Sequence, residues 1–152
     1  MRITAAIDVD ASPAVVWSCI AEPDKIVRWV EGALDHRYVG ARTGRPKVGD
    51  KFVQRLKQGR KVVEFEGTLT ACEEPSHFAF TIPSPAYSSE AHFRLTPQGS
   101  GGTHVDYSID VTLHTLAAKI AGAALRVPLA FFVRKQLRRL RALAVSLSRA
   151  AP

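Results

Sequence analysis

The sequence contains no asparagine among its 152 residues, so it offers no acceptor for N-linked glycosylation. It has only two cysteines. Cys19 and Cys72 lie far apart in apolar or strand-like segments, which favours buried free thiols over a disulfide or a metal-binding pair. Asp8 and Asp10 stand where a targeting sequence would be basic and then apolar, and we expect no apolar run long enough to span a bilayer. These absences favour a cytoplasmic protein.

Familiar catalytic and cofactor motifs are also missing. None of the histidines pairs with another histidine or with a cysteine in the pattern of a zinc site. The histidines are His36, His77, His92, His104 and His114. There is no Gly-x-Ser-x-Gly elbow, and the glycine-rich run at residues 99–102 is expected to join two strands instead of opening a helix. We therefore expect no metal and no cofactor.

Positive charge is in excess, with a net charge of +7 and a pI near 9.9. The densest basic cluster lies near the C-terminus and consists of Arg134, Lys135, Arg138, Arg139 and Arg141. A solvated helix face is the simpler interpretation, and contact with an anionic membrane or a protein partner is the alternative. No aromatic residues interleave with these cations to stack on bases, so we expect no nucleic acid partner.

The C-terminal stretch from His114 to Ser148 is expected to form one long amphipathic helix, because its apolar residues recur at steps of four and three. The predicted apolar stripe is Leu116, Ile120, Ala123, Val127 and Ala130, continued by Val133, Leu137, Leu140, Ala144 and Leu147. Pro128 interrupts the helical hydrogen bonds near the point where the stripe takes two successive steps of three. A helix of this length spans roughly 50 Å at ~1.5 Å per residue, so a broad surface is needed to cover it.

The remainder of the chain is expected to be rich in strands. Ser12-Pro13 and Glu22-Pro23 each predict the start of a short helix after a first strand around Ile3 to Val9. From Ala33 to Leu113 the apolar period is two, with turn residues between the segments. The predicted strands are Ala33 to Ala41, Lys51 to Lys57, Val62 to Cys72, His77 to Ile82, Glu90 to Pro97 and Thr103 to Leu113. Gly67 predicts a bulge or bend in the middle of its strand.

This order predicts an α+β fold in which residues 1–152 form one domain, with a curved seven-stranded antiparallel sheet and a long terminal helix across its apolar face. The segment IDVDASPAVVWSCIAEPDKIVRWV, from Ile7 to Val30, is followed by this meander and by a terminal helix that carries Pro128. In these features the whole chain resembles the START and birch-pollen-allergen superfamily (SRPBCC), and within it the polyketide cyclase/dehydrase-like bacterial proteins.

The resemblance implies a helix-grip fold whose sheet and long helix enclose an elongated apolar cavity. Proteins of this superfamily bind lipids, sterols, polyketides or quinones, and a minority catalyse cyclisation and dehydration. The small side chains of the central helix, from Ala117 to Ala124, are consistent with an open space there and equally with close packing of the helix on the sheet. Binding or transport of a hydrophobic small molecule is the leading hypothesis, and a polyketide cyclase, aromatase or dehydrase is the alternative.

The parity of the strands selects the candidate site residues. The expected ligand contacts are Trp29, Phe52, Gln54, Phe65, Phe80, Phe93, Tyr107, Ile109, Ile120, Ala124 and Phe131. Catalysis would need an acid or base in the cavity, and the candidates are His92, Arg94 and Tyr107. Alternation with Ala91, Phe93 and Leu95 predicts that His92 and Arg94 point outward, and only a bulge in the strand would turn them inward.

Overall fold

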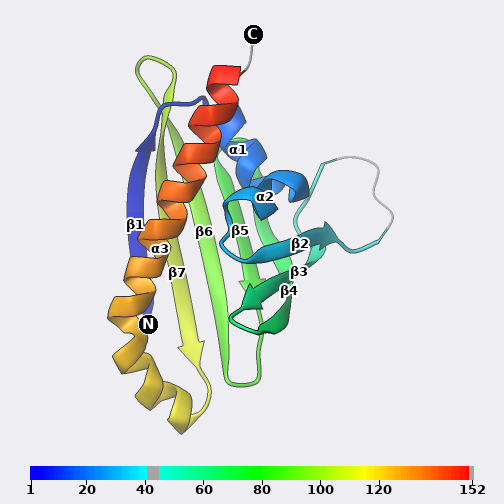
Figure 1. The fold of residues 1–152 in the computed structure, drawn as a ribbon, viewed down its shortest axis with the longest axis vertical. Helices are drawn as coiled ribbons and strands as arrows, with labels where there is room; N and C mark the ends of the chain where they lie inside the picture. The colour runs from blue at the N-terminus through cyan, green and yellow to red at the C-terminus, as the bar shows by residue number, and fades with distance from the viewer. Residues whose placement is uncertain (41–44, 151–152) are drawn as a thin grey trace.

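Seven antiparallel strands form a single sheet in the order β1-β7-β6-β5-β4-β3-β2 in the computed structural model, which describes residues 1–40 and 45–150 (Figure 1). The strands are β1 Arg2–Val9, β2 Ala33–Tyr38, β3 Lys51–Gln58, β4 Lys61–Glu73, β5 His77–Ile82, β6 Tyr87–Gln98 and β7 Gly102–Leu113. The helices are α1 Pro13–Ala21, α2 Pro23–Trp29 and α3 Leu116–Ala150. This order confirms the predicted α+β architecture. The predicted strand end at Ala41 lies outside the described residues.

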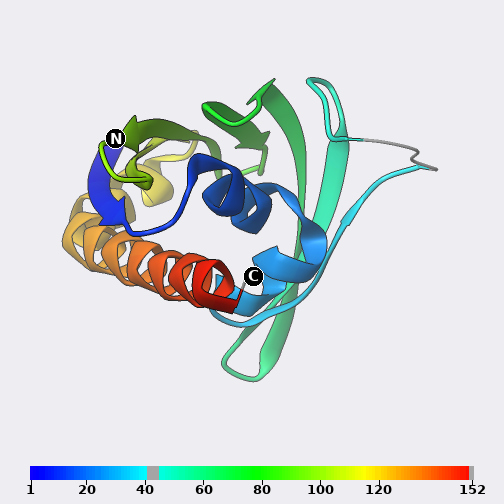
Figure 2. The ribbon, with the colours of Figure 1, turned by 90° about the horizontal axis from the view of Figure 1, so that it is seen from above.

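The three helices all lie on the concave side of the sheet. Figure 2 shows the short helices α1 and α2 within the curve of the sheet and α3 along its open side. The two short helices begin as predicted, because Pro13 and Pro23 occupy the first turn of each, and the Ser12 hydroxyl accepts a hydrogen bond from the Val15 amide at 3.3 Å. The sheet and the helices thus enclose one hydrophobic core.

The strand register places the predicted apolar parity on the concave face. Ile7 pairs with Val105, and Val105 pairs with Leu95, and all three belong to the core or pack against it. Ala91, Phe93 and Leu95 are buried, which confirms the predicted inward parity of β6. Charged residues such as Asp106 alternate with them and remain exposed on the convex face.

The expected bulge at Gly67 is displaced along the strand. The register of β4 shifts between Leu69 and Ala71, whereas Gly67 pairs regularly with Phe52. Gly67 has a different role, because a side chain there would overlap the ring of Phe52. The absence of a Cβ therefore makes room for an aromatic ring on the concave face, and the bend arises two residues later.

The second half of α3 packs on the core as the periodicity predicts. Val133, Leu137, Leu140 and Ala144 are all buried. The end of α2 and the loop after it fix this half in place. Gln136 accepts a hydrogen bond from the Glu31 amide at 3.0 Å, and the Arg139 Nε donates to the Trp29 carbonyl at 2.7 Å.

The first half of α3 contradicts the predicted orientation. Leu116, Ile120 and Val127 are 75%, 69% and 69% exposed, so the predicted stripe faces away from the sheet here. The side that approaches the sheet carries Gly122, where an added Cβ atom would overlap the Leu113 side chain of β7. The reason is geometric: a step of three residues falls about 60° short of a full helical turn, and the two successive steps after Val127 rotate the stripe by roughly 120°. A single continuous helix cannot direct both halves of such a stripe at one sheet.

The apolar content of α3 also corrects the expectation that no segment is long enough for a bilayer. By length and composition alone, α3 is long and apolar enough to cross a membrane. Only 11% of its apolar 18-residue stretch is buried within the structure. A single helix of this kind is weak evidence for a span, and α3 also contributes its second half to the core. The first half of α3 is therefore an apolar surface that the rest of the fold leaves exposed.

Candidate functional site

The concave face combines fully buried residues with apolar side chains that are only half-buried. Trp29, Phe52 and Phe93 belong to the buried core, where the Trp29 ring meets Phe93 edge-on at a centroid distance of 6.3 Å. The half-buried members among the predicted ligand contacts are Gln54, Phe65, Phe80, Tyr107 and Ile109. The half-buried residues are the ones that a ligand on this face could contact, whereas the first three hold the fold together.

A polar pair on this face joins Gln54, a predicted contact, to His36, which is missing from the predicted contacts. His36 of β2 pairs with Gln54 of β3, and the His36 Nδ1 lies 2.8 Å from the Gln54 Oε1. The imidazole stacks on Phe52, with ring centroids 5.0 Å apart, and meets Tyr38 edge-on. The Nε2 atom is buried and has no hydrogen-bond partner among the described residues. Burial lowers the pKa of His36, so the ring is neutral near pH 7.

The tautomer of His36 follows from this contact. Because the Gln54 Oε1 is an acceptor, the His36 Nδ1 carries the proton, and the Nε2 is left with a lone pair. An unpaired buried acceptor is costly, so the site favours a partner that donates a hydrogen bond. The sequence pattern could have indicated that His36 faces the same side as Leu34 and Tyr38, because the three residues are spaced at the two-residue period of a strand.

Tyr107 lies on the same face, as predicted. It pairs with Ala5 and Phe93, and its ring centroid is 4.8 Å from that of Phe93. Burial raises the pKa of its hydroxyl well above the usual 10. The phenol is therefore a neutral hydrogen-bond donor near pH 7 and no base, and its hydroxyl has no partner among the described residues.

Three predicted contacts lie on the outer surface. Ile120 and Phe131 are 69% and 65% exposed, and Ala124 is exposed as well. All three lie in the first part of α3, on the side that points away from the sheet. Their predicted inward orientation is wrong, for the rotational reason given above.

The catalytic candidates of β6 lie on the convex face, as the parity of the strand predicted. His92 forms a chain of hydrogen-bonding contacts there, with its Nδ1 2.9 Å from the His77 Nε2 and its Nε2 2.6 Å from the Glu90 Oε1. Arg94 is exposed and borders a hollow of about 280 Å³ that also touches Arg2 and Asp106. Neither residue enters the concave side, because β6 has no bulge that would turn them inward.

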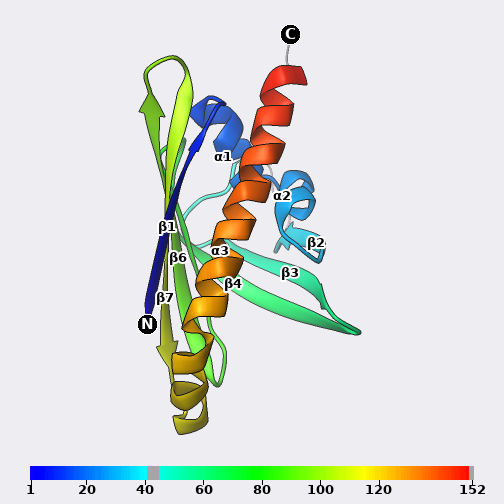
Figure 3. The same ribbon diagram turned by 60° about the vertical axis from the view of Figure 1, so that its left-hand side comes forward.

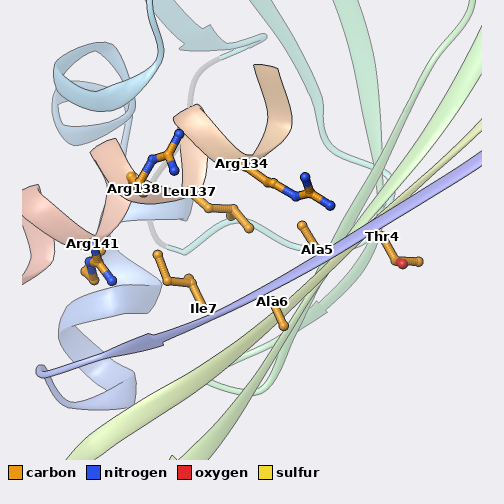
Figure 4. Close-up of a pocket in the computed structure, with 8 residues that line it drawn as sticks. All are labelled: Thr4, Ala5, Ala6, Ile7, Arg134, Leu137, Arg138 and Arg141. Atoms are coloured by element: carbon orange, nitrogen blue, oxygen red, sulfur yellow. The ribbon is translucent and has the colours of Figure 1, made fainter. Parts of the chain in front are cut away.

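The basic cluster of α3 divides into two groups. Lys135 and Arg139 contact the end of α2 and the loop after it, since the Lys135 ammonium lies 3.0 Å from the Glu31 carboxylate and Arg139 binds the Trp29 carbonyl. The second group consists of Arg134, Arg138 and Arg141, which border a hollow of about 500 Å³ between α3 and β1 (Figure 4). Its other walls are Thr4, Ala5, Ala6, Ile7 and Leu137. None of these three arginines forms an ion pair with a described residue. The expectation of a solvated basic face therefore agrees with these three exposed arginines, whereas Lys135 and Arg139 contact neighbouring residues.

No group of three or more histidine, cysteine, aspartate or glutamate side chains is arranged to hold a metal ion within residues 1–40 and 45–150. Both cysteines are free, and Cys19 is fully buried. Burial raises the pKa of the Cys19 thiol. Its protonated side chain behaves as part of the core.

Comparison with protein families shows to which family the chain is related. Residues 1–145 match the model described as polyketide cyclase/dehydrase and lipid transport. The chain belongs to this family. Comparison with curated protein sequences finds no match. The family membership and the fold agree with the resemblance to START-like proteins that the sequence suggested.

Solved structures show the same fold at low sequence identity. A protein from Thermus thermophilus superposes with a TM-score of 0.76 at 16% identity, over 97% of this chain and 99% of that one. A START superfamily protein from Mycobacterium smegmatis gives 0.70 at 12% identity, over 98% and 97%. An AHSA1-like protein from Aeromonas hydrophila gives 0.63 at 23% identity, over 97% and 94%. The fold of this family member is therefore a START-like helix-grip fold.

Proposed function

We propose that the protein binds and carries a hydrophobic small molecule that has at least one hydroxyl group, of the lipid, polyketide or quinol class. The apolar body of the ligand lies against the half-buried residues of the concave face, among them Phe65, Phe80 and Ile109. Its hydroxyl donates a hydrogen bond to the His36 Nε2. The observation that carries this proposal is the buried, unpartnered Nε2 atom in an otherwise apolar setting.

The polar groups of the site suit recognition better than acid–base turnover. His36 offers an acceptor to a ligand whose remaining surface is apolar, whereas the donor Tyr107 lies on β7, which four other strands of the sheet separate from β2. Polyketide cyclisation remains the alternative function of the same surface. It would have to use His36 as its base, because His92 and Arg94 lie on the convex face. Location in the cytoplasm remains a sequence-based prediction.

Native mass spectrometry of the purified protein, followed by denaturing extraction, tests the carrier proposal. We expect an adduct of defined mass that contains a hydroxyl group. The variant His36→Phe keeps the shape of the ring and removes the acceptor, so the adduct should be lost while the protein stays folded. His114→Phe is the matched control, because His114 is exposed and its ring Nε2 lies 3.1 Å from the Ser88 hydroxyl.

The proposal fails if His36→Phe retains the adduct as fully as His114→Phe. It also fails if no adduct is found and a panel of sterols, quinols and phenolic polyketides produces no increase in melting temperature, because a ligand that binds the folded state must stabilise it. Conversion of a polyketide panel member to a product of different mass by wild-type protein, lost in His36→Phe, would favour the cyclase alternative.

A further inference from the structure

The first half of α3 carries an apolar outer stripe that the fold does not use. It consists of Leu116, Ile120, Val127 and Phe131, which are 75%, 69%, 69% and 65% exposed. These positions are separated by four, seven and four residues, so they lie on one side of the helix. A continuous apolar surface of this kind is rare on a protein without a partner for it.

The same side of the helix becomes basic in the second half. Continuing by steps of three, four and three, the stripe passes from Phe131 to Arg134, Arg138 and Arg141. These are the three arginines that border the hollow beside β1 and have no ion pair among the described residues. Figure 4 shows their side chains around the α3 segment next to β1. One face of α3 therefore presents an apolar stretch followed directly by unneutralised positive charge.

The composition of α3 argues against a second copy as the occupant. The helix contains eight basic residues and no aspartate or glutamate over Leu116–Ala150. Two copies joined through this face would bring positive charges together with no acidic side chain on either helix to offset them. An anionic surface with an apolar interior meets both halves of the face: its hydrocarbon accepts the apolar stripe and its headgroups neutralise the arginines.

We propose that α3 docks the protein on an anionic lipid surface. The apolar stripe, defined as Leu116, Ile120, Val127 and Phe131, enters the boundary between headgroups and acyl chains, and Arg134, Arg138 and Arg141 contact lipid phosphates. The helix lies in the plane of the surface, since its opposite side remains packed on the sheet through Gly122 and Val133. The stripe extends over about 24 Å at 1.5 Å per residue. Figures 1 and 3 both show the start of α3 reaching past the end of β7, where a flat surface can approach it.

Co-sedimentation with phosphatidylcholine vesicles that contain phosphatidylglycerol, compared with pure phosphatidylcholine vesicles, tests this docking. Wild-type protein should bind the anionic vesicles, and the binding should weaken as salt is added. The double variant Ile120→Glu/Phe131→Glu should reduce partitioning at least about tenfold, because two apolar side chains no longer leave water. The matched control is Val48→Glu/Val62→Glu, which changes two residues that are 60% and 54% exposed elsewhere on the molecule.

Neutralising the arginines separates the electrostatic contribution to vesicle binding from the apolar contribution. Arg134→Gln/Arg138→Gln should lower binding to anionic vesicles by about fivefold per arginine and leave the weak binding to neutral vesicles unchanged. All of these residues are exposed, so circular dichroism melting should show intact folds.

The docking proposal is overturned if wild-type protein fails to bind anionic vesicles at low salt, or if the stripe variant binds as well as its control. It is also overturned if analytical ultracentrifugation shows a dimer that Ile120→Glu/Phe131→Glu dissociates, because the stripe would then be an interface between two copies. His36→Phe should still bind vesicles, so failure of ligand binding and failure of docking can be told apart.

Discussion

Gly67 is the position at which a single methyl group should disturb the candidate site most directly. A Cβ atom there would lie 2.6 Å from the Phe52 Cε1, closer still to its Cζ, and 2.9 Å from the Thr81 carbonyl oxygen. The carbonyl belongs to the backbone of β5 and cannot rotate away. The ring of Phe52 must therefore move, although it is 4% exposed and packed between His36 and Phe80.

The cost of Gly67→Ala follows from this overlap. Overpacking of a core typically costs about 1–3 kcal/mol. Alanine also restricts the unfolded chain, which returns about 0.4–1 kcal/mol. We expect a net loss of roughly 1–2 kcal/mol in the free energy of unfolding, which lowers the melting temperature by about 2–8 °C for a chain of this size. Displacement of the Phe52 ring should also weaken ligand binding, because His36 stacks on that ring.

Urea denaturation of a double-mutant cycle provides the assay. Phe52→Leu destabilises the wild-type background, but it removes the ring atoms that a methyl group at position 67 would strike, so it should cost less in the Gly67→Ala background. The coupling free energy should fall within about 0.5–3 kcal/mol, the range for residues in contact. Gly99→Ala is the control, since nothing lies within 4 Å of a Cβ at that position. Equal stability of Gly67→Ala and Gly99→Ala, or additive effects in the cycle, would refute the reasoning.

Three further predictions concern titration, thiol reactivity and the contact between α2 and α3. Burial holds the pKa of His36 below its usual 6.5, so the unfolded chain takes up a proton before the folded chain does. Stability should therefore fall as the pH drops through 6.5 toward the folded pKa, and urea midpoints of His36→Phe should show a smaller drop than wild type. In the native protein, Ellman's reagent should react with the half-buried Cys72 and not with Cys19, and Cys72→Ser should remove the native reaction. Arg139→Ala loses its hydrogen bond to the Trp29 carbonyl and should lose about 1–2 kcal/mol in urea denaturation, with Arg139→Lys restoring little because the planar guanidinium is missing.

Strand periodicity predicted the concave face well because a sheet with one solvated side forces strict alternation. In β7, Val105 and Tyr107 alternate with the exposed Asp106 and share the core with Leu95 and Phe93 of β6. The outward orientation of His92 follows from the same rule. Alternation on two adjacent strands leaves no freedom for an inward His92 unless the ladder is broken, and β6 pairs with β5 and β7 without a shift.

His36 and the first half of α3 escaped prediction for different physical reasons. The period of β2 is obscured by its register shift between Ala33 and Asp35 and by the exposure of Leu34, so a histidine among its residues gave a weak signal. In α3 the apolar period is genuine, but periodicity measures only that one face is apolar and not which partner covers it. The two short steps after Val127 were the available sign that the two halves of the stripe face different directions.

Packing within the folded domain does not explain the outward apolar residues of α3. The second half of the helix closes the core and is held by the end of α2 and the loop after it, so the first half continues from a fixed base. Polar helix formers at Leu116, Ile120, Val127 and Phe131 would extend the helix equally well and would avoid exposing large apolar side chains to water. Packing against the sheet does not favour apolar over polar residues at these four positions, because none of the four side chains is buried against it. The proposed docking on an anionic surface would account for their apolar character, and the arginines that follow on the same face would contact its headgroups.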